Sequence, residues 1–352
     1  MRLYTPGHGI ITDTLIMHGL VRIISANNII DGTVIREGIR YVIDINAEKI
    51  SAKVDFLDTL LRETKLYTQN EKVRSAYKYL SKIDASNINI PYYKKWISQL
   101  SEGIEKLDIN EFLSFDHRDK LKEGRVKSKK LKKLIALPLP LSFIYGKYFQ
   151  DSYKVEDKPY SVCLNCYVLS TLGLIFGTSI IFNINKDKKT VNLITIGPSD
   201  KMKIVDVLVI QRLLEKKPLF FKNDLPILAS LLYILSLGET LYALDENIEA
   251  IVWRLTKSGN SQRASFPITI NIKDLLDKIS TIKYHFPEFP RFIDECLIND
   301  EDGIVALNDL AFYLIYGGDS YGVLRKISRI VIKSQGKCNY NVAKLSKALE
   351  RM

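Results

Sequence analysis

The stretch PYSVCLNCYVLSTLGLIFGTSIIFNINKDKKTVNLITIGP, residues 159–198, combines two hydrophobic patterns that decide the fold. Its first part, CLNCYVLSTLGLIFG, has the length and apolar content of a buried helix. Two β-branched runs follow, SIIFNI and TVNLITI, on either side of the polar turn NKDKK. No charge interrupts Lys158 to Lys186, a length that would cross a bilayer, but Pro159 opens the stretch and polar residues punctuate it. We therefore predict a buried helix leading into a β-hairpin, rather than a membrane span.

The N-terminal part of the chain shows the same order of elements. Residues 8–25 carry apolar side chains at helical spacing, and residues 33–45, TVIREGIRYVIDI, read as two short strands around Glu37-Gly38. A Gly-Leu pair occurs in both helices, Gly19-Leu20 in the first and Gly173-Leu174 in the second. The parallel suggests two copies of one helix–hairpin unit.

The remaining chain is mostly helical in pattern. We expect a further hairpin at 248–256 and 264–271, and helices near 52–105, 200–216, 222–243, 272–285, 288–298, 303–315 and 321–333. Strands and helices do not alternate as in a doubly wound sheet, so we predict a helix-rich α+β fold with short antiparallel hairpins. Its expected divisions are 1–110, a helix–hairpin with a helical region; 111–158, a basic linker or long loop; and 159–352, a helix-rich α+β domain.

Composition places the chain among globular proteins with an anionic partner. The 352 residues are 46% hydrophobic and 26% charged, and the formal net charge is +11. A strongly basic balance favours a polyanion as partner. Four cysteines exclude a framework of several disulfides, and the opening MRLYTPGHGIITD lacks the pattern of a secretory signal. We expect a cytoplasmic protein that is not associated with a membrane.

The sequence contains no catalytic motif together with the partner residues that the motif requires. The chain contains no phosphate-binding G-x-x-x-x-G-K-[ST] and no H-E-x-x-H. Gly318-Asp319-Ser320-Tyr321-Gly322 matches the hydrolase elbow, but the last histidine is His285, upstream of the serine, so the required order of residues is absent. The acidic run that begins at Asp300 lacks calcium-loop spacing and is more typical of a helix N-terminus. We expect no catalytic residue.

The cysteines and histidines show no complete set of metal ligands. Cys163 and Cys166 form one C-x-x-C, for which two buried thiols on one helix face is the favoured interpretation, with zinc binding and redox chemistry as alternatives. Cys296 and Cys338 are distant and offer no matching spacing. The histidines, His8, His18, His117 and His285, are also unsuitably spaced; for His8 and His18 packing or capping is the favoured interpretation, with contact to a phosphate or a carboxylate as the alternative. We expect no metal ligand and no cofactor.

The sharpest feature is the basic segment from Arg118 to Lys133. It contains nine basic residues against Asp119 and Glu123, a net +7 within the chain's +11. Binding to a polyanion releases condensed counterions and relieves this repulsion. A solvated lysine-rich loop and an anionic membrane surface are the alternatives. The hairpin tip from Lys257 to Arg263 and the aromatic–basic run 91–96, PYYKKW, are further candidates for contact with nucleic acid.

Two stretches resemble a known family. TPGHGIITDTLIMHGLVRIISA, residues 5–26, resembles the start of archaeal CRISPR-associated proteins, in which a Thr-Pro turn leads into a helix that ends in a His-Gly-Leu step. CLNCYVLSTLGLIFG, the basic balance and the length are similar to one group of them, the large subunit of the type I-A (Apern-subtype) Cascade interference complex.

The resemblance implies a non-enzymatic role in antiviral defence beside guide RNA and target DNA. Such large subunits help to recognise the protospacer-adjacent motif, hold displaced DNA and recruit a separate nuclease-helicase, alongside the backbone and small Cascade subunits. The residues of this sequence proposed for nucleic-acid contact are Arg125, Lys127, Lys129, Lys130, Lys132, Lys133, Lys257 and Arg263. The alternatives are a metal-dependent nuclease whose acidic residues converge only in space, and a protein-interaction scaffold.

Overall fold

The chain folds into a helix-rich α+β structure, as its sequence patterns predict. The computed structural model describes residues 1–51, 103–104, 106–125, 134–137, 141, 160–184, 189–215, 218–238, 241, 244, 247–258, 261–334, 336 and 338–352. The helical region expected at 52–105 and the run 91–96 therefore lie almost wholly outside the described residues. Within the described ranges, no helix has the combination of length and apolar character needed to span a bilayer.

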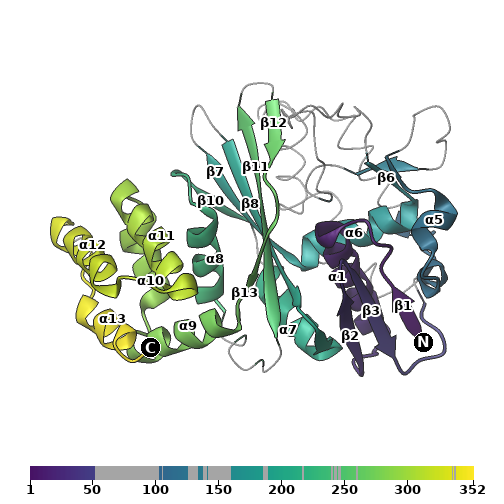
Figure 1. Cartoon of the computed structure of the whole chain (residues 1–352), viewed down its shortest axis with the longest axis horizontal. Helices are drawn as coiled ribbons and strands as arrows, with labels where there is room; N and C mark the ends of the chain where they lie inside the picture. The colour runs from purple at the N-terminus through teal and green to yellow at the C-terminus, as the bar shows by residue number, and fades with distance from the viewer. Residues whose placement is uncertain are drawn as a thin grey trace.

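A six-stranded sheet forms the middle layer of the molecule (Figure 1). Its order is β10-β7-β8-β11-β12, with β13 also paired to β11. The two long strands, β8 and β11, pair antiparallel from Lys189↔Lys257 to Pro198↔Ile248, and Trp253 of β11 is fully buried. The strands are β7 (Thr178–Ile184), β8 (Lys189–Pro198), β10 (Leu219–Phe221), β11 (Ile248–Ser258), β12 (Ser261–Ala264) and β13 (Ile268–Asn271). The first predicted hairpin, β7–β8, is confirmed, whereas the strand predicted at 264–271 is divided into β12 and β13, both of which pair with β11.

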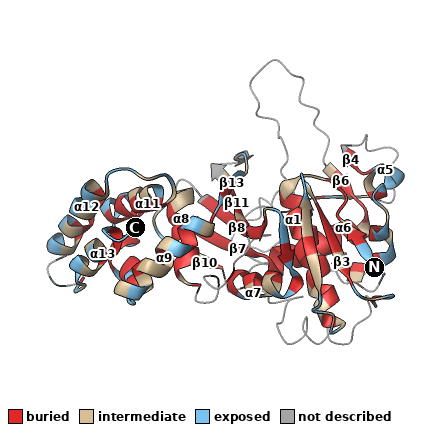
Figure 2. Cartoon of the chain, turned by 60° about the horizontal axis from the view of Figure 1, so that its bottom comes forward, coloured by how far each residue is buried: buried red, intermediate tan, exposed pale blue. Residues whose placement is uncertain are grey.

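Helices cover both faces of this sheet (Figure 1). On one side lie α8 (Ile227–Ser236), α9 (Lys273–His285), α10 (Phe289–Phe292), the π-helix η4 (Ile293–Leu297), α11 (Glu301–Tyr316), α12 (Ser320–Lys333) and α13 (Val342–Leu349). On the other lie α7 (Ile204–Leu214), α1 (Ile10–Ala26) and α6 (Leu164–Phe176). Figure 2 shows that α1, α6 and the central strands are mostly buried, whereas α12 and α13 alternate buried and exposed positions.

A second sheet, order β1-β3-β2-β9, packs against the outer side of α1. Its strands are β1 (Arg2–Tyr4), β2 (Gly32–Glu37), β3 (Arg40–Ile45) and β9 (Lys201–Lys203). The predicted hairpin turn falls at Gly38, whose φ of 66° is the left-handed conformation that favours glycine. Strand β9 follows β8 directly and pairs with β2, so the second helix–hairpin unit adds a strand to the sheet of the first.

The two Gly-Leu pairs lie where α1 and α6 cross. A Cβ built on Gly173 would lie 2.6 Å from Leu15 Cα and closer still to the Leu15 carbonyl oxygen. On the facing helix, a Cβ on Gly19 would lie 3.0 Å from Leu169 Cα and again closer to the carbonyl oxygen. The missing side chains thus let the two backbones touch, which joins the two predicted helix–hairpin units into one core.

The expected linker 111–158 contains short regular elements where it is described. They are η1 (Ile109–Leu113), α5 (His117–Leu121), β4 (Gly124–Arg125) and β5 (Ile135–Ala136). Strands β4 and β5 flank β6 (Tyr160–Val162) in a third sheet. Phe112 and His117 are buried, so this part of the segment packs onto the core of the protein.

Two features of the C-terminal region bear on the sequence interpretation. Cys296 and Cys338, for which we found no partner by spacing, form a disulfide with Cα atoms 5.5 Å apart, because the packing of η4 brings the chain after α12 beside it. Asp300 caps α11 by accepting a hydrogen bond from the Gly303 N–H at 3.2 Å, which confirms the interpretation of the acidic run as a helix N-terminus.

Candidate functional site

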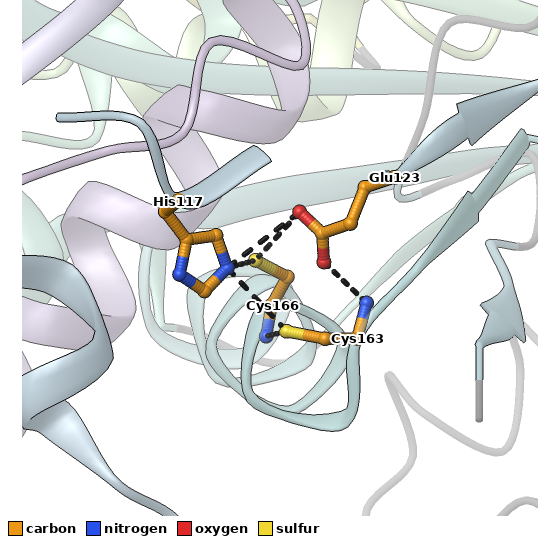
Figure 3. A group of neighbouring side chains, drawn as sticks. All are labelled: His117, Glu123, Cys163 and Cys166. Atoms are coloured by element: carbon orange, nitrogen blue, oxygen red, sulfur yellow. Dashed lines mark hydrogen bonds and ion pairs between the residues drawn. The ribbon is translucent and has the colours of Figure 1, made fainter. Parts of the chain in front are cut away.

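Four chemically reactive side chains meet in the interior between α5 and α6. They are His117, Glu123, Cys163 and Cys166, and one ligand atom of each lies within 4.8 Å of the others (Figure 3). His117 is the first residue of α5 and Glu123 lies two residues after its end, whereas the cysteines lie at the start of α6. No other group of three or more such side chains with this spacing occurs in the described part of the chain.

Strand pairing brings the two halves of this cluster together. Gly124 pairs with Ser161 and Arg125 with Tyr160, so β4 and β6 run antiparallel. Glu123 comes immediately before β4, and Cys163 comes immediately after β6. The same register therefore sets them side by side, and the Cys163 N–H donates a hydrogen bond to Glu123 Oε1.

The four donors converge on a single point. His117 Nε2 lies 3.2 Å from Cys166 Sγ, 3.5 Å from Cys163 Sγ and 3.6 Å from Glu123 Oε2. Cys166 Sγ lies 3.8 Å from Glu123 Oε2. Figure 3 shows these atoms facing one another, with the imidazole on one side and the sulfurs and the carboxylate on the other.

A surrounding set of contacts orients each donor. His117 Nδ1 lies 3.1 Å from the backbone carbonyl of Glu111, to which an Nδ1–H donates, and this leaves the Nε2 lone pair directed into the cluster. His8 Nε2 lies 3.1 Å from Glu123 Oε2, and His8 Nδ1 is 2.9 Å from the Tyr160 hydroxyl. The side chains of His8 and Glu123 are fully buried. The His8 side chain is thus buried and meets a carboxylate, the less favoured alternative for it.

The cluster strongly perturbs the protonation of its members. Burial opposes ionisation of Glu123, but contacts with His117 and His8 outweigh it and hold its pKa below the usual value. Burial likewise opposes charge on His117, but Cys163 and Glu123 raise its pKa to about 10. A hydrogen bond with Cys166 lowers the pKa of Cys163, whereas burial raises the pKa of Cys166 well above its usual value. These shifts favour an ionised Glu123 beside a charged His117 when no metal is bound.

This geometry suits binding better than nucleophilic catalysis. A cysteine–histidine–carboxylate relay needs the thiol and the carboxylate on opposite ring nitrogens. Here both sulfurs and the carboxylate approach the same nitrogen, Nε2 of His117, and Nδ1 faces a backbone carbonyl. The arrangement can hold a cation or allow the two thiols to react with each other.

Sequence reasoning identified the cysteine pair but missed the partners. His117 and Glu123 precede Cys163 by roughly 40 residues, and their separation from it matches no ligand motif. Only the pairing of β4 with β6 could have indicated that Glu123 lies beside Cys163. These strands of two and three residues are too short to recognise by periodicity. His18, by contrast, is a packed core residue, as expected, with Nε2 2.9 Å from the Ile196 carbonyl.

The proposed nucleic-acid contacts are distributed over separate parts of the fold. Arg125 lies in β4, on the three-stranded sheet, whereas Lys257 of β11 and Arg263 of β12 lie on the six-stranded sheet. In the hairpin, Lys257 pairs with Gln262 and Arg263 with Thr256. The lysine positions of the basic segment, Lys127, Lys129, Lys130, Lys132 and Lys133, lie outside the described residues.

Two arginines that lie close in sequence to the proposed contacts, Arg118 and Arg254, have hydrogen-bond partners within the fold. Arg118, the first residue of the basic segment, donates to the Gly7 carbonyl at 2.7 Å. Arg254, which precedes the hairpin tip, forms an ion pair with Asp224 at 2.5 Å and donates to the Leu225 carbonyl at 3.2 Å. Their guanidinium groups stabilise the fold, so they are poor candidates for phosphate contact.

Comparison of the sequence with known proteins identifies the family of this chain. The chain belongs to a CRISPR-associated protein family, Cas_Csa4, whose sequence profile matches residues 1–346. It is 32% identical over 356 residues to the CRISPR system associated protein Cas8 of Thermoproteus tenax, a match that covers 95% of this chain and 94% of the relative. The resemblance to archaeal CRISPR-associated large subunits is therefore confirmed.

Proposed function

We propose that this chain is the nucleic-acid-binding large subunit of a type I-A CRISPR Cascade complex. In this role it assists guide-RNA-directed recognition of target DNA in antiviral defence, beside the backbone and small subunits and a separate nuclease-helicase. It binds nucleic acid without catalysing a reaction. The observation that carries the proposal is the family match over residues 1–346, joined by nearly full-length similarity to a Cas8 protein.

Charge supports the nucleic-acid part of this proposal. The segment from Arg118 to Lys133 contributes +7 of the chain's +11, although Arg118 itself is engaged by the Gly7 carbonyl. The segment begins beside a structured anchor, because α5 and β4 pack on the core and only then does the lysine-rich stretch follow in the sequence. A positive segment on a fixed base is suited to follow a phosphate backbone without reading bases.

The test is a salt series on a charge-removed variant. Lys127, Lys129, Lys130, Lys132 and Lys133 are replaced together by Gln, and affinity for single-stranded and duplex DNA is measured by fluorescence anisotropy. For every phosphate that the variant no longer neutralises, the slope of log affinity against log salt becomes shallower, by about 0.9 on duplex and about 0.7 on single strands. We expect a total change of roughly two to four units, and a similar decrease in affinity for unrelated sequences.

A matched control separates local contact from overall charge. Five lysines that are exposed elsewhere on the molecule are replaced by Gln to remove the same net charge: Lys49, Lys201, Lys203, Lys222 and Lys347. The control variant should change the slope by less than about one unit. Equal slopes for the wild type and the segment variant would show that these lysines do not contact phosphates. Arg125, Lys257 and Arg263 are then replaced by Gln singly, because they belong to different sheets or strands.

A further inference from the structure

We propose that His117, Glu123, Cys163 and Cys166 bind one zinc ion at a structural site. This reverses the sequence expectation of two metal-free core thiols, since the structure supplies the two ligands that spacing did not reveal. The inference concerns the fold of this chain and does not depend on the proposed function.

Four of the six separations between donors fit a tetrahedral ion, and the other two, from Cys163 Sγ to Cys166 and to Glu123, are within 4.8 Å. Zinc bonds of about 2.3 Å to sulfur and about 2.0–2.1 Å to nitrogen or oxygen place tetrahedral ligands about 3.3–3.8 Å apart. The separations from His117 Nε2 to the other three donors, and from Cys166 Sγ to Glu123 Oε2, run from 3.2 to 3.8 Å. A set of two thiolates, one imidazole and one carboxylate is the mixed donor chemistry that zinc accepts.

The contacts around the donors are those that metal ligands require. The Glu111 carbonyl accepts from His117 Nδ1–H, which fixes the tautomer with Nε2 free to coordinate. Glu123 Oε1 accepts from the Cys163 N–H while Oε2 turns toward the cluster. The Cys166 N–H lies 3.4 Å from Cys163 Sγ, a contact that stabilises a thiolate.

Burial makes a cation at this point favourable. Glu123, Cys163 and Cys166 are all buried, and buried carboxylate and thiolate ligands need a cation beside them. Zinc binds two thiolates, a neutral imidazole and a carboxylate, so the protons carried by Cys163, Cys166 and the Nε2 atom of His117 are released to solvent on binding. With four protein ligands the ion has no open position, so the site is structural rather than catalytic.

The same geometry argues against a redox dithiol. Thiol–disulfide exchange needs an accessible attacking thiolate, but both Cys163 and Cys166 are buried. A redox dithiol would also leave unexplained why the imidazole of His117 and the carboxylate of Glu123 face the two sulfurs. Zinc uses all four groups, and it ties α5 and the strand before the lysine-rich segment to the start of α6.

The experiment measures bound metal on the full chain, purified without an affinity tag of histidines. Elemental analysis should find about one zinc per chain, and Cys163→Ser, Cys166→Ser and His117→Gln should each lower this to below about one tenth. The matched control is the double variant Cys296→Ser/Cys338→Ser, which removes the other two cysteines and should retain the zinc. Replacing zinc with cobalt should give thiolate charge-transfer bands and the intense visible bands of tetrahedral cobalt.

A second measurement uses the wild type, so that the proposal can be tested even if the ligand variants fail to fold. Chelation of the wild type should lower its thermal midpoint and expose two thiols to Ellman's reagent, and added zinc should restore both. Wild-type protein without stoichiometric zinc, even after zinc is supplied, would overturn the proposal. So would a Cys163–Cys166 disulfide in the purified protein, zinc that persists in Cys166→Ser, or octahedral cobalt spectra.

Discussion

At the crossing of α1 and α6, packing predicts that a Gly→Ala substitution destabilises the protein, whereas helix propensity predicts the opposite. Gly173 lies inside α6, where replacing glycine by alanine in an isolated helix stabilises it by about 1 kcal/mol. In this protein the new Cβ would lie 2.6 Å from Leu15 Cα, whereas ordinary van der Waals contact begins at 3.4 Å. The obstacle is backbone of the facing helix, so no side-chain rotation relieves it. We therefore expect Gly173→Ala to destabilise the protein.

The size of the effect follows from the distance that the helices must move. Ordinary contact requires a separation larger by about 0.8 Å at Leu15 Cα and by more at its carbonyl oxygen. Radial gaps of about 0.5–1 Å forfeit a quarter to a half of the dispersion energy along an interface. Overpacking of cores costs about 1–3 kcal/mol and sometimes more. Because the clash is with backbone, we take the upper end of this range and subtract the propensity gain of about 1 kcal/mol; we expect Gly173→Ala to lower the free energy of unfolding by about 2 kcal/mol.

Urea unfolding followed by circular dichroism measures this decrease, with Gly238→Ala as the control. A Cβ on Gly238 meets its nearest atoms at 3.4 Å, so the control should change stability by less than about 1 kcal/mol. Gly19→Ala forces the same helices apart, so the double variant should cost less than the sum of the single variants. A Gly173→Ala protein as stable as the wild type, or strict additivity, would refute the proposed close approach of the helices.

Three further predictions test other parts of the fold. Burial lowers the pKa of His18 from 6.5 to about 4, so stability present above pH 6.5 should be lost as pH falls toward 4, by up to about 3 kcal/mol, and urea unfolding of His18→Gln should show a smaller loss over that range. The Cys296–Cys338 disulfide closes a loop of sequence separation 42, so Cys338→Ser should lower stability by up to about 4 kcal/mol, and dithiothreitol should destabilise the wild type but not the variant. Asp300→Ala should cost about 1 kcal/mol by calorimetry and Asp300→Asn much less, since Asn can still accept from Gly303; equal losses would contradict capping.

Local pattern determined most of the elements in the described chain. The helix at 10–26, the hairpin strands at 32–45, and the helix and hairpin at 164–198 follow from spacings of 3.6 and 2 residues, which any folded state must satisfy to bury an apolar face. The family resemblance was also readable from these stretches. The paired glycines were visible in the sequence, although their function as contact points was not.

Tertiary structure alone decided the cluster and the disulfide. Glu123 meets Cys163 because β4 pairs with β6, and Cys296 meets Cys338 because helices after the central sheet pack together. Such contacts are made between residues about 40 apart, and their partners are selected by the packing of whole elements rather than by any repeating pattern. Sequence therefore determined which residues form helices and strands, whereas only the assembled core determined which of their polar side chains share one buried point.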